Sequence, residues 1–318
     1  IVTSIFIAAM LLNCVSCSSQ SEIAPKPVDP VILVVSDFVK GADVGWLPQM
    51  EATGYRFLDQ DGTPKDGLQL LKNKGMNAVR LRVWVNPSNH KIDGHCSKEE
   101  TLAMAVRAQK LGMRIMINFH YSDSWADPAK QNKPLAWANH SVAQLKQDVY
   151  NHTLEVLTAL KLAGVTPEWV QVGNEIPGGM LWPEGSTTNW SQLAQFLNSG
   201  YDAVKAVDPK IKVVVHVDEG NNNAKFRWFF DAATTQNVKY DIIGLSYYPY
   251  WIQKDYTQTV ADLAANMNDM VTRYNKDVMV VEVGGEYDKV QKTYDMLRAT
   301  IQAVKNVHNN RGLGVMYW

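Results

Sequence analysis

From residue 38 onward, short apolar runs alternate with longer segments in which apolar residues recur every three or four positions. The short runs are nearly continuous in Val, Ile, Leu and Met, a pattern typical of parallel strands buried on both faces. The pattern predicts strands over 38–43, 78–84, 114–120, 169–174, 212–217, 242–246, 278–283 and 314–317.

Helix start and stop signals lie between these runs. Ser97-x-x-Glu100 and Ser141-x-x-Gln144 match the capping box, and Gly112 and Gly164 stand where helices should end. The segment after Ser141 carries a single apolar stripe, formed by Val142, Leu145, Val149, Val156 and Leu160. Helices are also predicted over 193–207, 256–274 and 294–307, and an eighth helix after the last strand is missing from the sequence.

Strict alternation of eight strands with helices predicts an α/β protein with a single (β/α)8 TIM-barrel domain over 37–318. A doubly wound open sheet is the alternative, but it normally carries a glycine-rich phosphate turn, and the sequence has no G-x-G-x-x-G. Because strand eight lacks a covering helix, we expect the sequence to be a fragment without its C-terminal helix.

Composition narrows the class of protein. The 318 residues are 46% apolar and 20% charged with a net charge of −1, which excludes disorder and a polytopic membrane protein. No basic surplus points to nucleic acid. The 10 Trp and 13 Tyr residues suit ligands with flat apolar faces, of which sugars are the commonest.

The first residues predict export. Residues 1–12 are almost wholly apolar and shorter than the roughly 20 residues of a membrane span, as in a signal peptide. Ser16-Cys17 resembles a bacterial lipoprotein cleavage site, so 1–16 is interpreted as signal peptide, Cys17 as the lipidated residue and 17–36 as a proline-rich tether. Cys14 fits worse because Asn13 precedes it, and a secretory signal cut elsewhere is the alternative. The predicted location is the bacterial envelope (outer membrane or cell surface), otherwise the medium.

Candidate chemistry gathers at the predicted strand ends, where barrel enzymes place their active sites. Each residue alone has a structural explanation: Arg82 could belong to a buried ion pair, and His120 could be a core histidine. Their common position at one rim favours a functional site. The set comprises Asp43, Arg82, His120, Asn174, Glu175, His216, Asp218, Tyr247, Tyr248, Glu282 and Trp318.

Glu175 and Glu282 are the strongest candidates for a catalytic pair. Both follow apolar strands, where a lone carboxylate would be costly to bury. Two carboxylates facing each other across a barrel mouth are what glycosidic cleavage requires: one donates a proton and the other meets the developing cation. The remaining carboxylates rank lower, because they precede a strand or lie in loops or early helices (Glu168, Glu184, Glu219 and Glu286).

Other hydrolase chemistries lack their signatures. A metal-dependent barrel hydrolase would carry a His-x-His pair on an early strand, but the seven histidines do not pair, so no catalytic metal is expected. A Gly-x-Ser-x-Gly nucleophile turn is also absent from the sequence.

Five motifs carry a resemblance to glycoside hydrolase family 53. They are Gly41-Ala-Asp-Val-Gly-Trp, Arg80-Leu-Arg-Val-Trp, Asn118-Phe-His-Tyr-Ser-Asp-Ser-Trp-Ala-Asp-Pro, Gln171-Val-Gly-Asn-Glu and Gly244-Leu-Ser-Tyr-Tyr-Pro-Tyr-Trp. The resemblance runs from about residue 38 to 318. It implies a retaining endo-β-1,4-galactanase that acts on the galactan side chains of pectin (type I arabinogalactan), with no cofactor for catalysis.

The resemblance also implies residue roles. Glu175 would be the acid/base, Glu282 the nucleophile and Asn174 the ligand of the sugar 2-hydroxyl, while Arg82 would lie beside Glu282 and hold it ionised. Five further residues would line the subsite of the cleaved sugar: Asp43, His120, His216, Tyr247 and Trp318. Four tryptophans would stack on sugar rings, with core packing as their alternative role: Trp84, Trp125, Trp182 and Trp251. Val283-Gly-Gly departs from the family, which more often has Thr-Gly and an aromatic residue there.

Two alternatives remain open from the sequence. One is another retaining barrel glycosidase, such as a mannanase or cellulase. The other is a non-catalytic glycan-binding lipoprotein, although a binder has no need of both Glu175 and Glu282. The expected partner is a galactan polysaccharide, with no nucleic acid, a membrane only through the lipid anchor, and a monomeric state. Some bacterial family members carry calcium in late loops, and this sequence does not support such a site.

Overall fold

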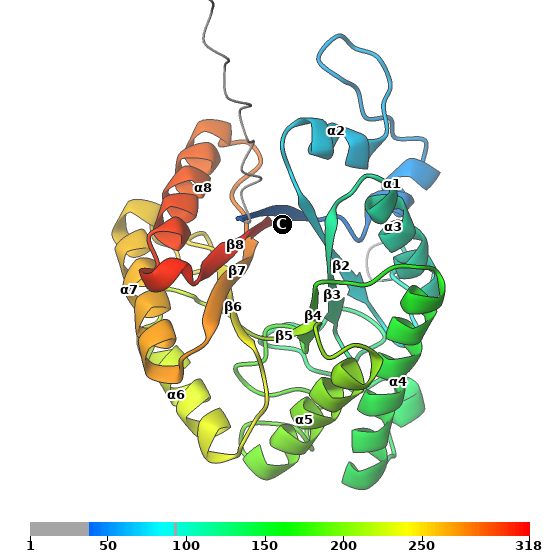
Figure 1. The fold of residues 1–318 in the computed structure, drawn as a ribbon, viewed down its shortest axis with the longest axis vertical. Helices are drawn as coiled ribbons and strands as arrows, with labels where there is room; N and C mark the ends of the chain where they lie inside the picture. Colours follow the sequence, from blue (N-terminus) through cyan, green and yellow to red (C-terminus); the bar gives the residue numbers. More distant parts are fainter. Residues whose placement is uncertain (1–37, 92–93) are drawn as a thin grey trace, which may run out of the picture. The chain divides into compact units, whose positions relative to one another are not determined.

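All eight predicted strands are present and close into one barrel (Figure 1). The computed structural model describes residues 38–91 and 94–318, and the predicted signal peptide, Cys17 and tether lie outside the described residues. The strands are β1 (Val39–Asp43), β2 (Ala78–Val83), β3 (Arg114–Phe119), β4 (Trp169–Val172), β5 (Lys212–Val217), β6 (Ile242–Tyr247), β7 (Asp277–Val283) and β8 (Gly312–Tyr317). Each pairs in parallel with its neighbours, and β1 pairs with β8, so the (β/α)8 prediction is confirmed.

Helices surround the barrel on its outer side (Figure 1). They are α1 (Leu47–Ala52), α2 (Gly67–Asn73), α3 (Lys98–Lys110), α4 (Val142–Leu162), α5 (Trp190–Val207), α6 (Asn223–Thr235), α7 (Tyr256–Tyr274) and α8 (Val290–Lys305), with short 3-10 helices at Leu135–Trp137 and His308–Asn310. Both predicted capping boxes are present at the starts of α3 and α4. None of the helices in the described part of the chain is long and apolar enough to cross a membrane.

Three helices were not predicted from the sequence. Of these, α1 and α2 are only six and seven residues long and lie between β1 and β2. In α6, aromatic residues of modest helix propensity obscure the helical signal. Phe226, Phe229, Phe230 and Ala233 nevertheless follow the i, i+3, i+4, i+7 spacing, and all are buried. Packing of this stripe against the barrel therefore stabilises the helix more than its intrinsic propensity does.

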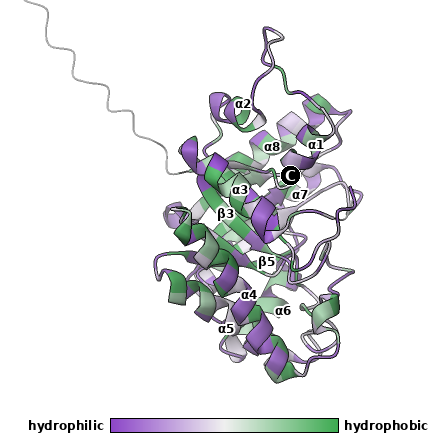
Figure 2. Cartoon of the chain, turned by 90° about the vertical axis from the view of Figure 1, so that its right-hand side faces the viewer, coloured by the Kyte–Doolittle hydropathy of each residue, from purple (hydrophilic) through white to green (hydrophobic). Residues whose placement is uncertain are grey.

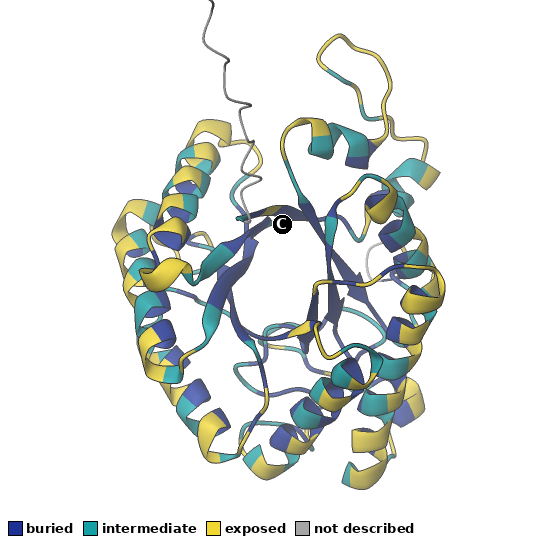
Figure 3. Cartoon of the chain, in the orientation of Figure 1, coloured by how far each residue is buried: buried dark blue, intermediate teal, exposed yellow. Residues whose placement is uncertain are grey.

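The strands divide the core into two parts. Residues that point outward from the barrel, such as Ile115, Ile117 and Phe119 of β3, pack against the helices. Residues that point inward at the N-terminal end form a separate apolar cluster: Val39, Ala78, Met116, Trp169, Val214, Ile242, Met279, Val281 and Met316. Figures 2 and 3 show the result, with hydrophobic, buried strands inside helices whose outer faces are hydrophilic and exposed.

The inward face changes from apolar to polar along the strands. Since side chains two residues apart share a face, the positions that follow the apolar cluster also point into the barrel. In β2 these are Arg80 and Arg82, in β3 Asn118, and in β4 Gln171, and all four side chains are buried. The barrel thus has an apolar base and a polar layer near the C-terminal ends of its strands.

Candidate active site

A cavity of about 600 Å³ opens above this polar layer. It lies at the C-terminal ends of the strands, where a barrel of this kind carries its active site. Nine of the eleven residues predicted at the rim line it: Asp43, Arg82, His120, Asn174, Glu175, Asp218, Tyr248, Glu282 and Trp318. The structure therefore brings both candidate catalytic glutamates, Glu175 and Glu282, into one cavity.

The backbone after β4 turns sharply to place Glu175. The strand ends at Val172, Gly173 has a φ of +84° and Glu175 itself has a φ of +43°. A positive φ is uncommon for a residue with a side chain, and it is retained where surrounding contacts hold it. The Glu175 backbone N–H donates to His216 Nδ1 at 3.3 Å, and the Ile176 N–H donates to the His216 carbonyl at 3.0 Å.

A β-bulge turns Glu282 into the barrel. In the pairing of β6 with β7, Leu245 lies opposite Val280 and Ser246 lies opposite Glu282, so Val281 is the extra residue. Val281 belongs to the inward apolar cluster, and simple alternation would have directed Glu282 outward. The bulge instead lets Glu282 Oε1 reach Arg80 Nη2 at 2.7 Å, while the Tyr248 hydroxyl donates to Oε2 at 3.0 Å.

The surroundings of the two carboxyl groups differ in charge. Burial, followed by the negative charge of Glu282, raises the pKa of Glu175 to about 8. Burial also raises the pKa of Glu282, but the guanidinium of Arg80 and the Tyr248 hydroxyl oppose this effect. Since Glu282 holds the direct ion pair with Arg80, we assign the anion to Glu282 and the retained proton to Glu175 near neutral pH.

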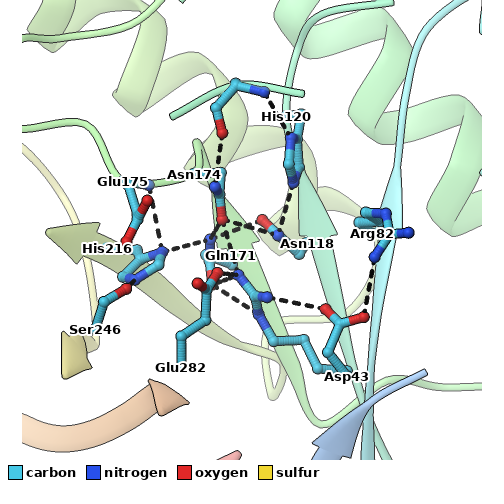
Figure 4. A network of polar contacts seen from close by, with 12 residues as sticks. Asp43, Arg82, Asn118, His120, Gln171, Asn174, Glu175, His216, Ser246 and Glu282 are labelled. Atoms are coloured by element: carbon cyan, nitrogen blue, oxygen red, sulfur yellow. Dashed lines mark hydrogen bonds and ion pairs between the residues drawn. The ribbon is translucent and has the colours of Figure 1, made fainter. Parts of the chain in front are cut away.

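A hydrogen-bonded network fixes the side chains below the pair (Figure 4). Arg80 binds Asp43 at 2.9 Å, Gln171 at 3.1 Å and the Asn174 side-chain oxygen at 2.8 Å. The Asn174 amide nitrogen donates to the Ala126 carbonyl at 2.8 Å. These contacts determine which way the Asn174 amide faces, and one of its N–H groups remains for a ligand.

The expected pairing of Arg82 with Glu282 is wrong. The cation that pairs with Glu282 is Arg80, which is two residues earlier on the same inward face of β2. Arg82 instead contacts Asp43 Oδ1 at 3.2 Å and lies over the Trp125 ring at 4.3 Å. Both arginines point inward, and only the depth of Glu282 in the barrel decides which of them reaches it.

Three other predicted subsite residues lie away from the cavity. Tyr247 is buried and points outward, where its hydroxyl contacts Thr259 of α7 at 2.8 Å. Tyr248 is in phase with the inward Ser246, so it is Tyr248 and not Tyr247 that lines the cavity. Trp84 is fully buried and packs edge-to-face on Trp125 at 5.2 Å, so it supports that ring and has no face for a sugar.

His216 is the third of these residues. It points inward but is fully buried beneath Glu175, and its Nε2 contacts Ser246 Oγ at 2.7 Å. It belongs to the support of the acid/base candidate and not to the cavity wall.

Of the tryptophans predicted to stack on sugars, some line the cavity and others do not. Trp125 and Trp251 line the cavity, and Trp251 is 73% exposed. Trp125 contacts Trp318 edge-to-face at a centroid distance of 6.3 Å, which places two indole rings on one side of the site. Trp182 instead donates from its indole N–H to the Gly178 carbonyl and covers that glycine.

Several residues of the site were missed from the sequence. Arg80, Gln171 and Ser246 complete the polar layer or the cavity wall. The signal that could have found Arg80 and Gln171 is the period of two along β2 and β4, which puts them in phase with Arg82 and with the inward Trp169. Within residues 38–91 and 94–318, no group of three or more His, Cys, Asp or Glu side chains is arranged to hold a metal ion.

A closed (β/α)8 barrel with a buried glutamate and a half-buried glutamate of unequal proton affinity at its C-terminal rim defines a glycoside hydrolase. Comparison with known proteins agrees, because the sequence profile of Glycosyl hydrolase family 53 matches residues 39–318. The chain belongs to this family.

Named relatives and solved structures resemble the chain over most of its length. The chain is 34% identical over 300 residues to the arabinogalactan endo-beta-1,4-galactanase of Humicola insolens, covering 88% of each protein. It is 32% identical to the endo-beta-1,4-galactanase of Bacillus subtilis, over 89% of this chain and 70% of that protein. The solved catalytic domain of an Ignisphaera aggregans family 53 protein superposes with a TM-score of 0.80 at 33% identity, covering 92% of this chain and 87% of that one.

Proposed function

We propose that the chain is a retaining endo-β-1,4-galactanase that hydrolyses the β-1,4-linked galactan of type I arabinogalactan. The observation that carries this proposal is the Glu175–Glu282 pair, in which one carboxyl group keeps its proton and the other has a direct cation partner. The names of the relatives supply the substrate, because the Humicola and Bacillus proteins are both endo-β-1,4-galactanases.

In the first step Glu282 attacks the anomeric carbon of a galactosyl unit while Glu175 gives its proton to the departing oxygen. A covalent glycosyl ester forms on Glu282 and the charge of that carboxylate disappears. Because this charge contributes to the high pKa of Glu175, the pKa of Glu175 falls once the ester has formed. Glu175 then accepts a proton from water while the water oxygen attacks the anomeric carbon, and the bond from that carbon to Glu282 breaks. The sugar leaves with its original configuration, and Glu282 regains its charge.

The supporting residues have distinct tasks in this scheme. Arg80 and the Tyr248 hydroxyl keep Glu282 ionised and oriented for attack. Asn174, held by Arg80 and by the Ala126 carbonyl, offers its remaining amide N–H to the sugar 2-hydroxyl. Trp125, Trp251 and Trp318 provide apolar surface for the flat faces of neighbouring galactosyl units.

Digestion of purified polysaccharides tests this function. The protein should release short oligosaccharides from β-1,4-galactan and leave β-mannan and cellulose intact, and NMR should show the β-anomer as the first product. A Glu282→Gln variant, which keeps the side-chain volume and removes the nucleophile, should be inactive on galactan. Cleavage of mannan or cellulose in preference to galactan would support the other retaining glycosidases, and binding without cleavage would support the glycan-binding lipoprotein.

Export and lipid anchoring form a further part of the proposal and rest on the sequence alone. Ser16-Cys17 and the proline-rich segment after it support an anchor at the bacterial envelope. Expression in a bacterium with labelled fatty acid should label the protein, and Cys17→Ala should abolish the label. Label that survives this substitution would contradict acylation at Cys17.

A further inference from the structure

Gln131 lies behind the cavity wall, on the loop between β3 and α4. Residues 126–129 of this loop line the cavity, whereas Gln131 does not and is 2% exposed. Its side-chain nitrogen lies 2.8 Å from the carbonyl oxygen of Asn174, 3.1 Å from that of Glu175 and 3.0 Å from that of Asp127. Because all three neighbours are acceptors, they fix the orientation of the amide, and its nitrogen donates both of its protons to them.

Two of these carbonyls belong to the peptide groups on either side of the Glu175 Cα atom. The Asn174 carbonyl is part of the peptide before that atom, and the Glu175 carbonyl is part of the peptide after it. A peptide group is rigid, so binding both carbonyls to one nitrogen limits the φ and ψ angles of Glu175 together. Since these two angles direct the Cα–Cβ bond, they also direct the carboxyl group.

His216 holds the opposite edge of the same two peptides. The Glu175 N–H donates to His216 Nδ1 at 3.3 Å, and the Ile176 N–H donates to the His216 carbonyl at 3.0 Å. Gln131 and His216 together therefore bind both carbonyls and both N–H groups that flank the Glu175 Cα atom. The left-handed conformation of Glu175, with a φ of +43°, is costly for a residue with a side chain and persists where contacts of this kind hold it.

We propose that Gln131 is a positioning residue that, opposite His216, clamps the backbone of Glu175 and so holds the acid/base carboxyl group at the leaving oxygen. The proposal rests on the function of Glu175 as acid/base proposed above. A general acid must lie within hydrogen-bond distance of the oxygen that it protonates, and a displacement of about 1 Å can cost about 100-fold in rate. The Asn174 side chain is held separately by Arg80, so loss of the Gln131 amide acts through Glu175.

The loop that carries Gln131 is fixed by its own backbone. Asp127 and Lys130 exchange two backbone hydrogen bonds, at 2.9 and 3.0 Å, and the Gln131 carbonyl accepts the Trp182 N–H at 2.8 Å. None of these bonds involves the Gln131 side chain. A substitution of that side chain therefore frees the Glu175 backbone while the cavity wall stays in place.

The test compares two aryl β-galactobiosides that differ in the leaving phenol alone, one phenyl and one dinitrophenyl. Gln131→Met keeps an unbranched side chain of similar length and removes the donor. Its kcat/KM should fall by about 10–100-fold on the phenyl compound, whose leaving oxygen needs a proton, and by less than about threefold on the dinitrophenyl compound, which needs little proton donation. The ratio of the two values, measured on one sample, is independent of the fraction of protein that is folded.

Two further variants complete the comparison. Asn266→Leu is the matched control: Asn266 is a buried amide that donates to the Gly220 carbonyl at 2.7 Å, on the loop after β5, and its loss should change kcat/KM of both compounds by the same factor. Gln131→Asn keeps the amide on a side chain one methylene shorter. Its ratio should lie between those of wild type and Gln131→Met, and it carries the test if the methionine variant does not fold.

The outcomes separate the clamp from the function on which it rests. Glu175→Ala should show the largest difference between the two compounds, and an equal loss on both would refute the acid/base role of Glu175 itself. If Glu175→Ala shows that difference but the Gln131 variants lose activity equally on both compounds, the positioning role of Gln131 is overturned and the acid/base assignment stands.

Discussion

Arg80 is the common cation partner of Asp43 and Glu282. Its side chain is fully buried and also binds Gln171 and Asn174, and its positive charge compensates the two buried carboxylates. The sequence placed two arginines on one face of β2 but did not show which of them reaches the nucleophile candidate. Which arginine reaches Glu282 depends on the register of β7, a strand roughly 200 residues further along the chain. No local pattern in β2 indicates that register.

Replacing Arg80 with methionine should therefore affect both stability and chemistry. The substitution leaves Asp43 and Glu282 buried without their cation, which should lower the free energy of unfolding by roughly 3–5 kcal/mol. Loss of the positive charge should raise the pKa of Glu282 and so move the acid limb of kcat/KM to higher pH, with at least a ~100-fold fall at its maximum. Denaturant titrations and pH profiles measure the two effects.

Arg273→Met is the control for this substitution. Arg273 forms an ion pair with Asp231 at the surface at 2.9 Å, and both side chains are more than 40% exposed. A pair of this kind contributes about 0–1 kcal/mol, so the variant should fold and act like wild type. Similar losses in the two variants would contradict a special role for Arg80.

At the scale of elements, strand and helix signals differ in how far they reveal the structure. The eight apolar runs and the two capping boxes are local features, and each was located within a few residues. The bulge at Val281 and the aromatic helix α6 depend on packing against neighbouring strands, so the sequence did not show them. The bulge matters most for function, because it directs Glu282 into the cavity.

The capping boxes give a prediction at this scale. Ser97→Ala and Ser141→Ala each remove a side-chain acceptor at a helix start, and each should lower the free energy of unfolding by about 1 kcal/mol. Aspartate at either position keeps an acceptor and should restore most of the loss. Urea unfolding measures these changes, and galactanase activity at ordinary temperature should stay unchanged because both caps lie on the outer helices. An alanine variant as stable as wild type would show that the cap is not needed there.

At the scale of the whole molecule, the site is assembled from strands spread over the entire barrel. The side chains that surround the cavity come from β1, β2, β6 and β7 and from the segments that follow β3, β4, β5 and β8. The sequence therefore predicts that polar strand ends converge, since barrel closure requires it. It does not rank these residues by depth, which is why Tyr247, Trp84 and His216 were expected to bind the sugar and Arg80 was not expected in the site.

The proton held by Glu175 should make the stability of the molecule depend on pH. In the unfolded chain this group titrates near its ordinary pKa of 4.5, whereas in the folded chain its pKa is about 8. Between these values the folded state holds a proton that the unfolded state has lost, so the free energy of unfolding falls as the pH rises. Glu175→Gln removes this titration. Its free energy of unfolding should therefore rise, relative to that of wild type, by roughly 3–5 kcal/mol between pH 5 and pH 9.

Urea unfolding of both proteins at the two pH values measures this gain. Glu168→Gln, at a side chain that is 44% exposed, serves as the control and should show little change between the two. A difference between Glu175→Gln and wild type that stays constant from pH 5 to pH 9 would contradict a raised pKa at Glu175.

The central claim is that Glu282 attacks the sugar and Glu175 transfers the proton, and chemical rescue with azide tests it most directly. On an aryl galactobioside with an activated leaving group, Glu175→Ala should still form the glycosyl ester, and azide should capture it as a β-glycosyl azide. Glu282→Ala should lose the ester, and azide entering from the vacated side should give the α-glycosyl azide. NMR of the products distinguishes the two anomers. The opposite stereochemistry would exchange the two assignments, and hydrolysis with inversion by the wild-type protein would contradict the double-displacement mechanism itself.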